Sequence, residues 1–228
     1  MPYFYYDWTM ILVIPGLLLG LYAQFKVKST FARYSRVRTK SGLTAEAAAR
    51  MLLSRGGSTN VTISRVNGSL TDHYDPSSKT LRLSDSVYGS DSVAAVGVAA
   101  HECGHALQEH DGYGLLKLRT ALVPVVNIGS SLYLPIFMAG LLFSWEPLQM
   151  VGILCFGLTL LFSLVTLPVE INASRRALGM LDGVLEAEEL QGAKAVLSAA
   201  ALTYLASVIS SALQLLRLIL ISRSRNRD

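Results

Sequence analysis

Long uncharged runs are the most prominent feature in the pattern of hydrophobic and polar positions along this chain of 228 residues. Three of them cover residues 8–25, 120–143 and 147–169. A helix needs about 20 apolar residues to cross a hydrocarbon core roughly 30 Å thick. The second and third runs meet that length and the first is just long enough, so the pattern predicts three membrane-spanning helices.

A fourth uncharged run, residues 199–216, has more than one interpretation. Gln214 and Arg217 interrupt its apolar character, and a crossing here would place the basic residues that follow on the outer side, against the positive-inside rule. The run could instead lie along the membrane surface as an amphipathic helix, or pack against the folded part of the chain. We favour a fourth membrane-embedded helix, which gives three to four in total, and the side of the C-terminus stays open.

The basic residues predict how these helices are oriented. Six follow the first run with no acidic residue among them: Lys26, Lys28, Arg33, Arg36, Arg38 and Lys40. The positive-inside rule places that flank in the cytoplasm, and it places the connection at residues 144–147, which has no basic residue, on the other side. Arg175 and Arg176 then return the chain to the cytoplasm. The first run lacks the basic start and the small-residue cleavage site of a signal peptide, so we expect a retained anchor.

The stretch between the first two runs has the pattern of a small folded domain with helices and strands. Thr44 can cap a helix that continues to about Ser54, and Ser90 or Asp91 can cap a second helix that ends near His110. The second helix carries small residues that allow close packing against its neighbours: Ala94, Ala95, Gly97, Ala99, Ala100 and Gly104.

The strand pattern of this domain lies between the two helices. Residues 60–66 alternate between apolar and polar side chains, Asn67-Gly68 is a strong hairpin signal, and residues 69–74 are predicted to return beside the first strand. A third short strand is expected at residues 80–84. Together with the uncharged runs, these elements divide the chain into an anchor at 1–25, an α+β domain at 26–119, a membrane hairpin at 120–169, a cytoplasmic helical segment at 170–198 and a C-terminal apolar helix with a basic tail at 199–228.

Composition and charge exclude several classes of protein. Hydrophobic residues make up 51% of the chain and charged residues 16%, which is typical of a membrane protein and not of a soluble one. The net charge of +4 comes largely from the cluster beside the first run, so it indicates contact with the lipid bilayer and no nucleic-acid partner. The two cysteines, Cys103 and Cys155, offer no disulfide framework and are predicted to be small buried apolar residues.

The residues from His101 to His105 match the motif H-E-x-x-H on the second predicted helix. Positions four apart share a helix face, so both imidazoles can bind one metal ion while Glu102 reaches a water molecule beside it. Zinc in a catalytic site takes three protein ligands, and Glu102 would be the general base. The alternative is a buried helix that carries two hydrogen-bonded histidines.

A third ligand is expected from the topology. Two crossings lie between residues 105 and 170, so the chain returns to the side it left, and Glu170 is the first charged residue after the membrane run. His101, His105 and Glu170 would then bind one zinc ion per chain, close to the membrane surface. Ser174, one turn later, could hydrogen-bond a ligand. The competing interpretations are an ordinary charge at a helix end for Glu170 and an ordinary helix residue for Ser174.

These residues carry a resemblance to a known family. His101–His105, the segment from Glu170 to Ser174, and the segment Asp72-His73-Tyr74-Asp75-Pro76 resemble the YugP-like family of bacterial membrane zinc metallopeptidases. More distant relatives, the HtpX-type membrane peptidases, have E-x-x-x-D where this chain has Ser174 in the last position. Asn172, inside the same segment, is a further candidate for a position next to the ligands.

The resemblance implies an α-helical integral membrane protein with a small α+β, zincin-like catalytic domain in the cytoplasm. It implies a zinc-dependent endopeptidase of the gluzincin type in the bacterial cytoplasmic membrane, with polypeptide substrates. His73 and Tyr74 could line the substrate cleft, since a strand edge beside the motif helix can bind an extended peptide, and Tyr204 could donate to the oxyanion. Paired strand residues and an interfacial tyrosine are the competing interpretations.

Two other classes of function compete with a peptidase. A non-catalytic zinc sensor or scaffold would favour a fourth Cys or His ligand, and none is apparent near the motif. A transporter would favour ionisable groups inside the membrane runs, and the clean runs contain none.

Overall fold

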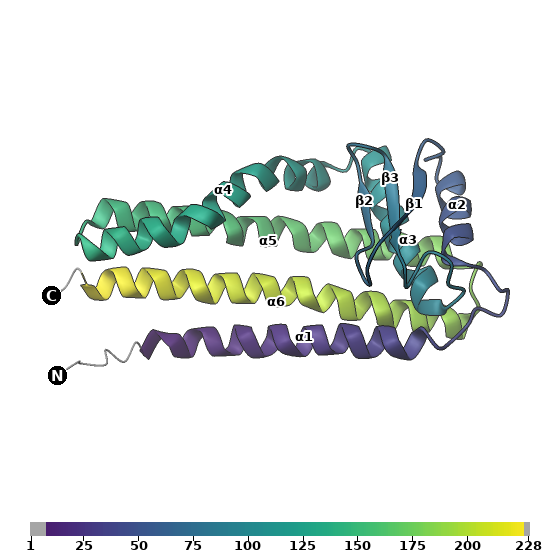
Figure 1. Cartoon of the computed structure of the whole chain (residues 1–228), viewed down its shortest axis with the longest axis horizontal. Helices are drawn as coiled ribbons and strands as arrows, with labels where there is room; N and C mark the ends of the chain where they lie inside the picture. The colour runs from purple at the N-terminus through teal and green to yellow at the C-terminus, as the bar shows by residue number, and fades with distance from the viewer. Residues whose placement is uncertain (1–7, 226–228) are drawn as a thin grey trace. The chain divides into compact units, whose positions relative to one another are not determined.

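The computed structural model describes residues 8–225 of the chain, which form two compact units (Figure 1). The first unit contains residues 8–22, 118–167 and 203–225, and the second contains residues 23–117 and 168–202. The first residues of the predicted anchor (1–7) and the end of the basic tail (226–228) lie outside the described residues.

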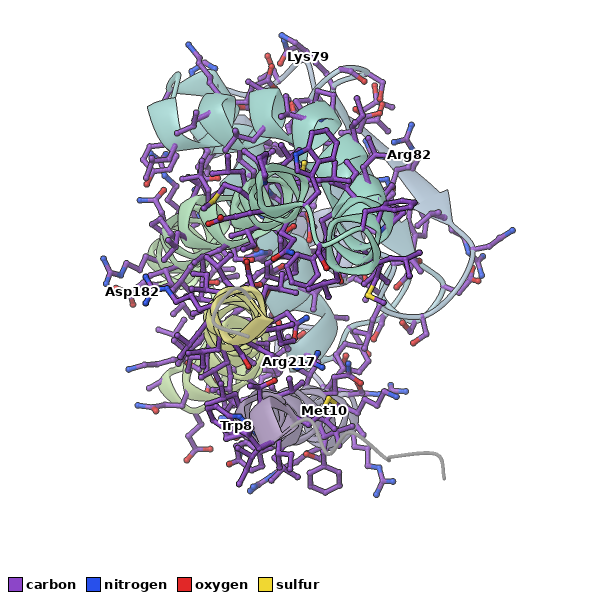
Figure 2. All side chains as sticks on the ribbon, turned by 90° about the vertical axis from the view of Figure 1, so that its left-hand side faces the viewer. Trp8, Met10, Lys79, Arg82, Asp182 and Arg217 are labelled. Atoms are coloured by element: carbon purple, nitrogen blue, oxygen red, sulfur yellow. The ribbon has the colours of Figure 1, made fainter. Side chains whose placement is uncertain are left out.

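Four helices among the described residues are long and apolar enough to cross a membrane. A short 3-10 helix, η1 (Trp8–Leu12), leads into α1 (Val13–Tyr34), and α4 (Gly114–Leu142), α5 (Glu146–Leu181) and α6 (Ala187–Arg225) are the other three. Length and composition thus support the favoured interpretation of the fourth run. The side chain of Arg217, which interrupts that run, points from α6 toward η1 and donates from Nε to Thr9 Oγ1 at 3.3 Å (Figure 2).

In the second unit, two short helices lie beside a three-stranded sheet (Figure 1). Helix α2 (Ala45–Arg55) is capped by Thr44, as predicted, because the Thr44 hydroxyl accepts a hydrogen bond from the Ala47 amide. Helix α3 (Val93–His110) carries the H-E-x-x-H motif. Its cap is Ser92, and not the predicted Ser90 or Asp91, since the Ser92 hydroxyl accepts from the Ala95 amide.

The sheet corrects the predicted hairpin. Strands β1 (Thr62–Val66), β2 (His73–Asp75) and β3 (Thr80–Ser84) stand in the order β1-β3-β2, with β3 parallel to β1 and antiparallel to β2. The chain therefore does not fold back at Asn67-Gly68 to pair β2 with β1, although Gly68 does take a positive φ of 111°.

Hydrogen bonds of Asp72 and Asp85 tie the loop between β1 and β2 to the end of β3 instead. The Asp85 carboxylate accepts a hydrogen bond from the Gly68 amide at 3.0 Å, and Asp72 accepts from the amide and hydroxyl of Ser84 at 2.7 and 2.9 Å. These contacts anchor both ends of the loop to the end of β3, so the strand that follows pairs with β3. Local turn propensity predicted a hairpin, and longer-range polar contacts decided otherwise.

The core of the second unit gathers around α3. Buried apolar residues come from α2, β3, α3 and the parts of α5 and α6 in this unit, among them Leu52, Leu81, Val96 and Leu181. The small residues of α3 permit this packing, because a Cβ added at Gly97 would lie 3.3 Å from the Cβ of Ala193 on α6. Helix α3 is therefore enclosed on several sides, and its motif face meets α5.

Candidate metal centre

Three side chains with metal-binding atoms meet between α3 and α5. Nε2 of His101 lies 3.2 Å from Oε2 of Glu170, and Nε2 of His105 lies 3.5 Å from the same oxygen. One ligand atom from each of the three residues falls within 4.8 Å of the others. Glu170 and His105 are buried and His101 is partly buried. The structure thus brings together the three residues that the sequence proposed as ligands.

Gly104 allows this meeting of helices. A Cβ at Gly104 would lie 2.5 Å from the carbonyl oxygen of Ala173, well inside any real contact distance. The backbones of α3 and α5 therefore touch between the two histidines on one side and Glu170 and Ser174 on the other. The glycine within the motif is required by packing, independent of any role in the chemistry.

Each histidine is held at its other ring nitrogen. Ser174 Oγ lies 3.1 Å from Nδ1 of His101, which matches the position proposed for Ser174 beside a ligand. Oε1 of Gln108 lies 3.0 Å from Nδ1 of His105. Sequence reasoning missed Gln108. The signal that could have found it is its spacing, because a residue three positions after His105 on a helix lies beside it.

Asn172 is linked to a candidate ligand through another side chain, whereas the sequence suggested a position next to the ligands. Its side-chain oxygen accepts hydrogen bonds from Nε2 of Gln108 at 2.9 Å and from Nε of Arg176 at 2.9 Å. Arg176 in turn pairs with Asp111, the C-cap residue of α3. Asn172 therefore connects to His105 through Gln108.

Glu102 is buried on α3, directly after His101, with 8% of its surface exposed. Its negative charge is one of several influences on the pKa of the His105 imidazole. Burial alone lowers the pKa of His105, but the hydrogen bond to Glu170 and the negative charges of Glu102 and Glu170 outweigh burial and raise it. The two buried carboxylates, Glu102 and Glu170, suit a site for a divalent cation.

The types of donor atom, and two of the three separations between them, fit zinc. Two ligands bound to one tetrahedral zinc at about 2.0–2.2 Å stand about 3.4 Å from each other. The two separations between histidine nitrogen and carboxylate oxygen, 3.2 and 3.5 Å, bracket that value. Two imidazoles and one carboxylate also form one of the ligand sets of catalytic zinc, and they leave a fourth position for water.

The weaker candidates are placed elsewhere. His73 is exposed on β2, where its Nδ1 lies 2.8 Å from the Thr71 carbonyl. Tyr74 donates its hydroxyl to Glu109 of α3 and lines a polar cavity of about 180 Å³ with Ser58, Asn60, Val61, Lys79, Ala106, Glu109 and His110. None of the three candidate ligands lines that cavity. Tyr204 belongs to the first unit, whereas the candidate ligands belong to the second. The roles proposed for these three residues stay predictions.

The remaining sequence features have structural explanations. Cys103 is fully buried, and its thiol lies 3.7 Å from the Ala49 carbonyl on α2, so burial raises its pKa and it packs as a small apolar residue. Cys155 is partly buried, and both cysteines are free. In the segment 72–76, Asp72 fixes the end of β3, and Asp75 accepts hydrogen bonds from Ser77 and Ser78 in the turn that follows β2.

Comparison with known proteins gives consistent matches. The family described as "Putative neutral zinc metallopeptidase" matches residues 9–223. Over 214 residues the chain is 44% identical to "Putative membrane protease YugP" of Bacillus subtilis (strain 168), covering 93% of this chain and 95% of that protein. No solved structure matches the chain.

Proposed function

Since the chain belongs to this family of neutral zinc metallopeptidases, we propose that it is a membrane-embedded zinc endopeptidase that cleaves membrane or membrane-proximal proteins. The observation that carries the proposal is the convergence of His101, His105 and Glu170 within 4.8 Å, with Glu102 adjacent on the same helix. A structural helix with two satisfied histidines would not need a buried carboxylate from a second helix at that point.

Each residue of the candidate metal centre has a proposed role in peptide hydrolysis. His101, His105 and Glu170 would hold zinc, which lowers the pKa of water and polarises a peptide carbonyl. Glu102 would accept the proton of the attacking water and donate it to the nitrogen of the leaving amine. Ser174 and Gln108 would keep the two imidazoles oriented, because each contacts the ring nitrogen that faces away from Glu170.

The proposed location is the bacterial cytoplasmic membrane, with the site on the cytoplasmic face. Four apolar helices and the membrane protease named among the relatives support the membrane. The face is proposed from the charges, because six basic residues at 26–40 follow the uncharged run 8–25 and none is present at 144–147. Glu170 directly follows the uncharged run 147–169, which supports substrates in or near the bilayer.

The test is cleavage of an unstructured protein, casein, by the full chain in detergent, with bound zinc counted. Wild type is compared with Glu102→Gln and with Glu188→Gln, which removes an exposed carboxylate on α6. We expect about one zinc per chain in all three, with cleavage by wild type and Glu188→Gln only.

Two results would contradict the proposal. Cleavage by Glu102→Gln at the wild-type rate would remove Glu102 from the chemistry. Zinc in every protein with no cleavage of casein or of detergent-solubilised membrane proteins would favour the second candidate, a non-catalytic zinc sensor or scaffold.

A further inference from the structure

The Gln108 side chain is fully buried and makes three hydrogen bonds. Its Nε2 donates to the Val169 carbonyl at 2.8 Å and to Asn172 Oδ1 at 2.9 Å, and its Oε1 lies 3.0 Å from Nδ1 of His105. Exchanging the amide oxygen and nitrogen would place the oxygen against two acceptors. Both N–H groups are therefore used on α5, and Oε1 is left as an acceptor for His105.

This orientation determines the tautomer of His105. An acceptor at Nδ1 requires that Nδ1 carries a hydrogen, so the neutral imidazole has its lone pair on Nε2. Nε2 is the atom that lies 3.5 Å from Oε2 of Glu170. The Gln108 carboxamide thus leaves the lone pair of His105 on Nε2, the nitrogen on the side of Glu170.

Gln108 also ties the two ligand-bearing helices together. The carbonyl that it binds belongs to Val169, the residue immediately before Glu170. Through Asn172 and Arg176, the same set of hydrogen bonds returns to Asp111 at the end of α3. A shift of α5 along α3 would break these bonds as well as the contact at Gly104.

We propose that Gln108 is the positioning residue of the metal centre, which fixes the tautomer of His105 and the register of α5 and so sets the zinc affinity without touching the metal. The inference rests on the proposed zinc site. The competing explanation is a purely structural role, in which Gln108 only satisfies the Val169 carbonyl inside the core.

The experiment measures zinc affinity of the full chain in detergent by competition with a fluorescent chelator, and thermal unfolding of the metal-free protein. Gln108→Met keeps the length of the side chain and removes all three hydrogen bonds. Gln108→Glu keeps an acceptor for His105 and loses the donors to α5. Gln191→Met, at an exposed position of α6, is the matched control.

We expect Gln108→Met to bind zinc about 10–100-fold more weakly than wild type, the range for loss of a partner behind a histidine ligand. Gln108→Glu should recover part of that loss, and Gln191→Met should match wild type. Each metal-free protein should show a cooperative thermal unfolding transition, as a folded domain does. Unchanged zinc affinity in Gln108→Met would overturn the proposal. So would equal zinc affinity of the Met and Glu variants, because the acceptor for His105 would then be irrelevant.

Zinc affinity is measured independently of cleavage. If wild type binds zinc and cleaves nothing, the peptidase proposal fails while the role of Gln108 is still decided by the affinities. If wild type binds no zinc, the metal site and this inference fail together.

Discussion

In the first unit many large apolar side chains face outward around a small buried cluster of Phe137, Ile153, Phe156 and Leu218, whereas in the second unit most of them form a larger core. Leu17, Ile128 and Leu154 are 58–64% exposed in the first unit, while Leu52, Leu81 and Leu181 of the second are 0–1% exposed. Trp8 and Met10, both more than half exposed, belong to the same outward-facing set (Figure 2). Apolar side chains that face outward suit a lipid environment, where burying them between helices gives little driving force. Apolar side chains that face inward suit a domain in water, because burial removes them from the solvent.

The two units also differ in how the hydrogen bonds between their helices are connected. In the first unit the bonds between helices form short sets: Gln149 donates to the Gly140 carbonyl at 3.1 Å and accepts from Ser222 at 2.7 Å, and Ser163 and Ser207 lie 3.1 Å apart. In the second unit a longer set of bonds runs from Asp111 to His105. Short sets hold helices together, and the longer set also reaches a candidate metal ligand.

Removing the shared carboxylate should give the largest effect. Glu170→Gln loses the charge that faces both histidines, so we expect zinc affinity to fall by more than the about 10–100-fold caused by loss of an outer partner. Zinc counting and chelator competition measure it. Glu146→Gln, an exposed position at the start of the same helix in the first unit, should bind zinc as wild type does.

The next-largest effect is expected from a substitution where α3 and α5 approach closely. Gly104→Ala would press a methyl group onto the Ala173 carbonyl, so we expect about 1–3 kcal/mol of lost stability and zinc affinity reduced about tenfold or more. Gly179→Ala, on α5, is the control, because a Cβ there meets no atom within 4 Å. Normal zinc binding by Gly104→Ala would show that the helix contact does not set the site.

A matched glycine in the first unit should separate stability from metal binding. A Cβ at Gly140 would lie 2.6 Å from the Gln149 amide nitrogen, so Gly140→Ala should cost about 1–3 kcal/mol. We expect a lower melting temperature with zinc affinity unchanged, and Gly157→Ala, with nothing within 4 Å, as control. A parallel loss of zinc would show that the two units are coupled.

A single hydrogen bond in the first unit should matter little. Ser163→Ala removes the bond to Ser207, and bonds between helices in membranes contribute about 0.6 kcal/mol on average. Thermal unfolding in detergent, compared with Ser198→Ala at an exposed position, measures it. A loss several times larger would contradict the view that these bonds act separately.

The smallest effect is expected at Asp75, outside the site. Hydrogen bonds from Ser77, Ser78 and Arg82 hold the pKa of Asp75 well below its ordinary range. A lowered pKa stabilises the fold above the unfolded-state value of about 3.9, and the stabilisation is lost as pH falls below it. Asp75→Asn should therefore unfold at a slightly lower temperature than wild type at pH 7, and the difference should shrink progressively as pH falls below about 4 toward the lower pKa of the folded state.

Local patterns predicted most of the elements. The Thr44 cap, the small-residue helix with the motif, the third short strand and the uncharged runs all follow from side chains close in sequence, and the structure contains each of them. The hairpin was wrong because its turn signal at Asn67-Gly68 competes with contacts to the end of β3, where Asp72 accepts from Ser84 and Asp85 accepts from the Gly68 amide.

The sequence by itself determined the chemistry available to this protein: two histidines and a glutamate on one helix, a carboxylate after a membrane run, and a family resemblance consistent with the family match. Only the tertiary structure decided that Glu170 lies 3.2 Å from His101, that Gly104 is the contact with Ala173, and that Gln108 holds His105. The physical reason is the difference in sequence range between the two kinds of interaction. Helix propensity, capping and hydrophobic runs act over a few residues, whereas the position of a side chain 60 or more residues away depends on how the helices pack.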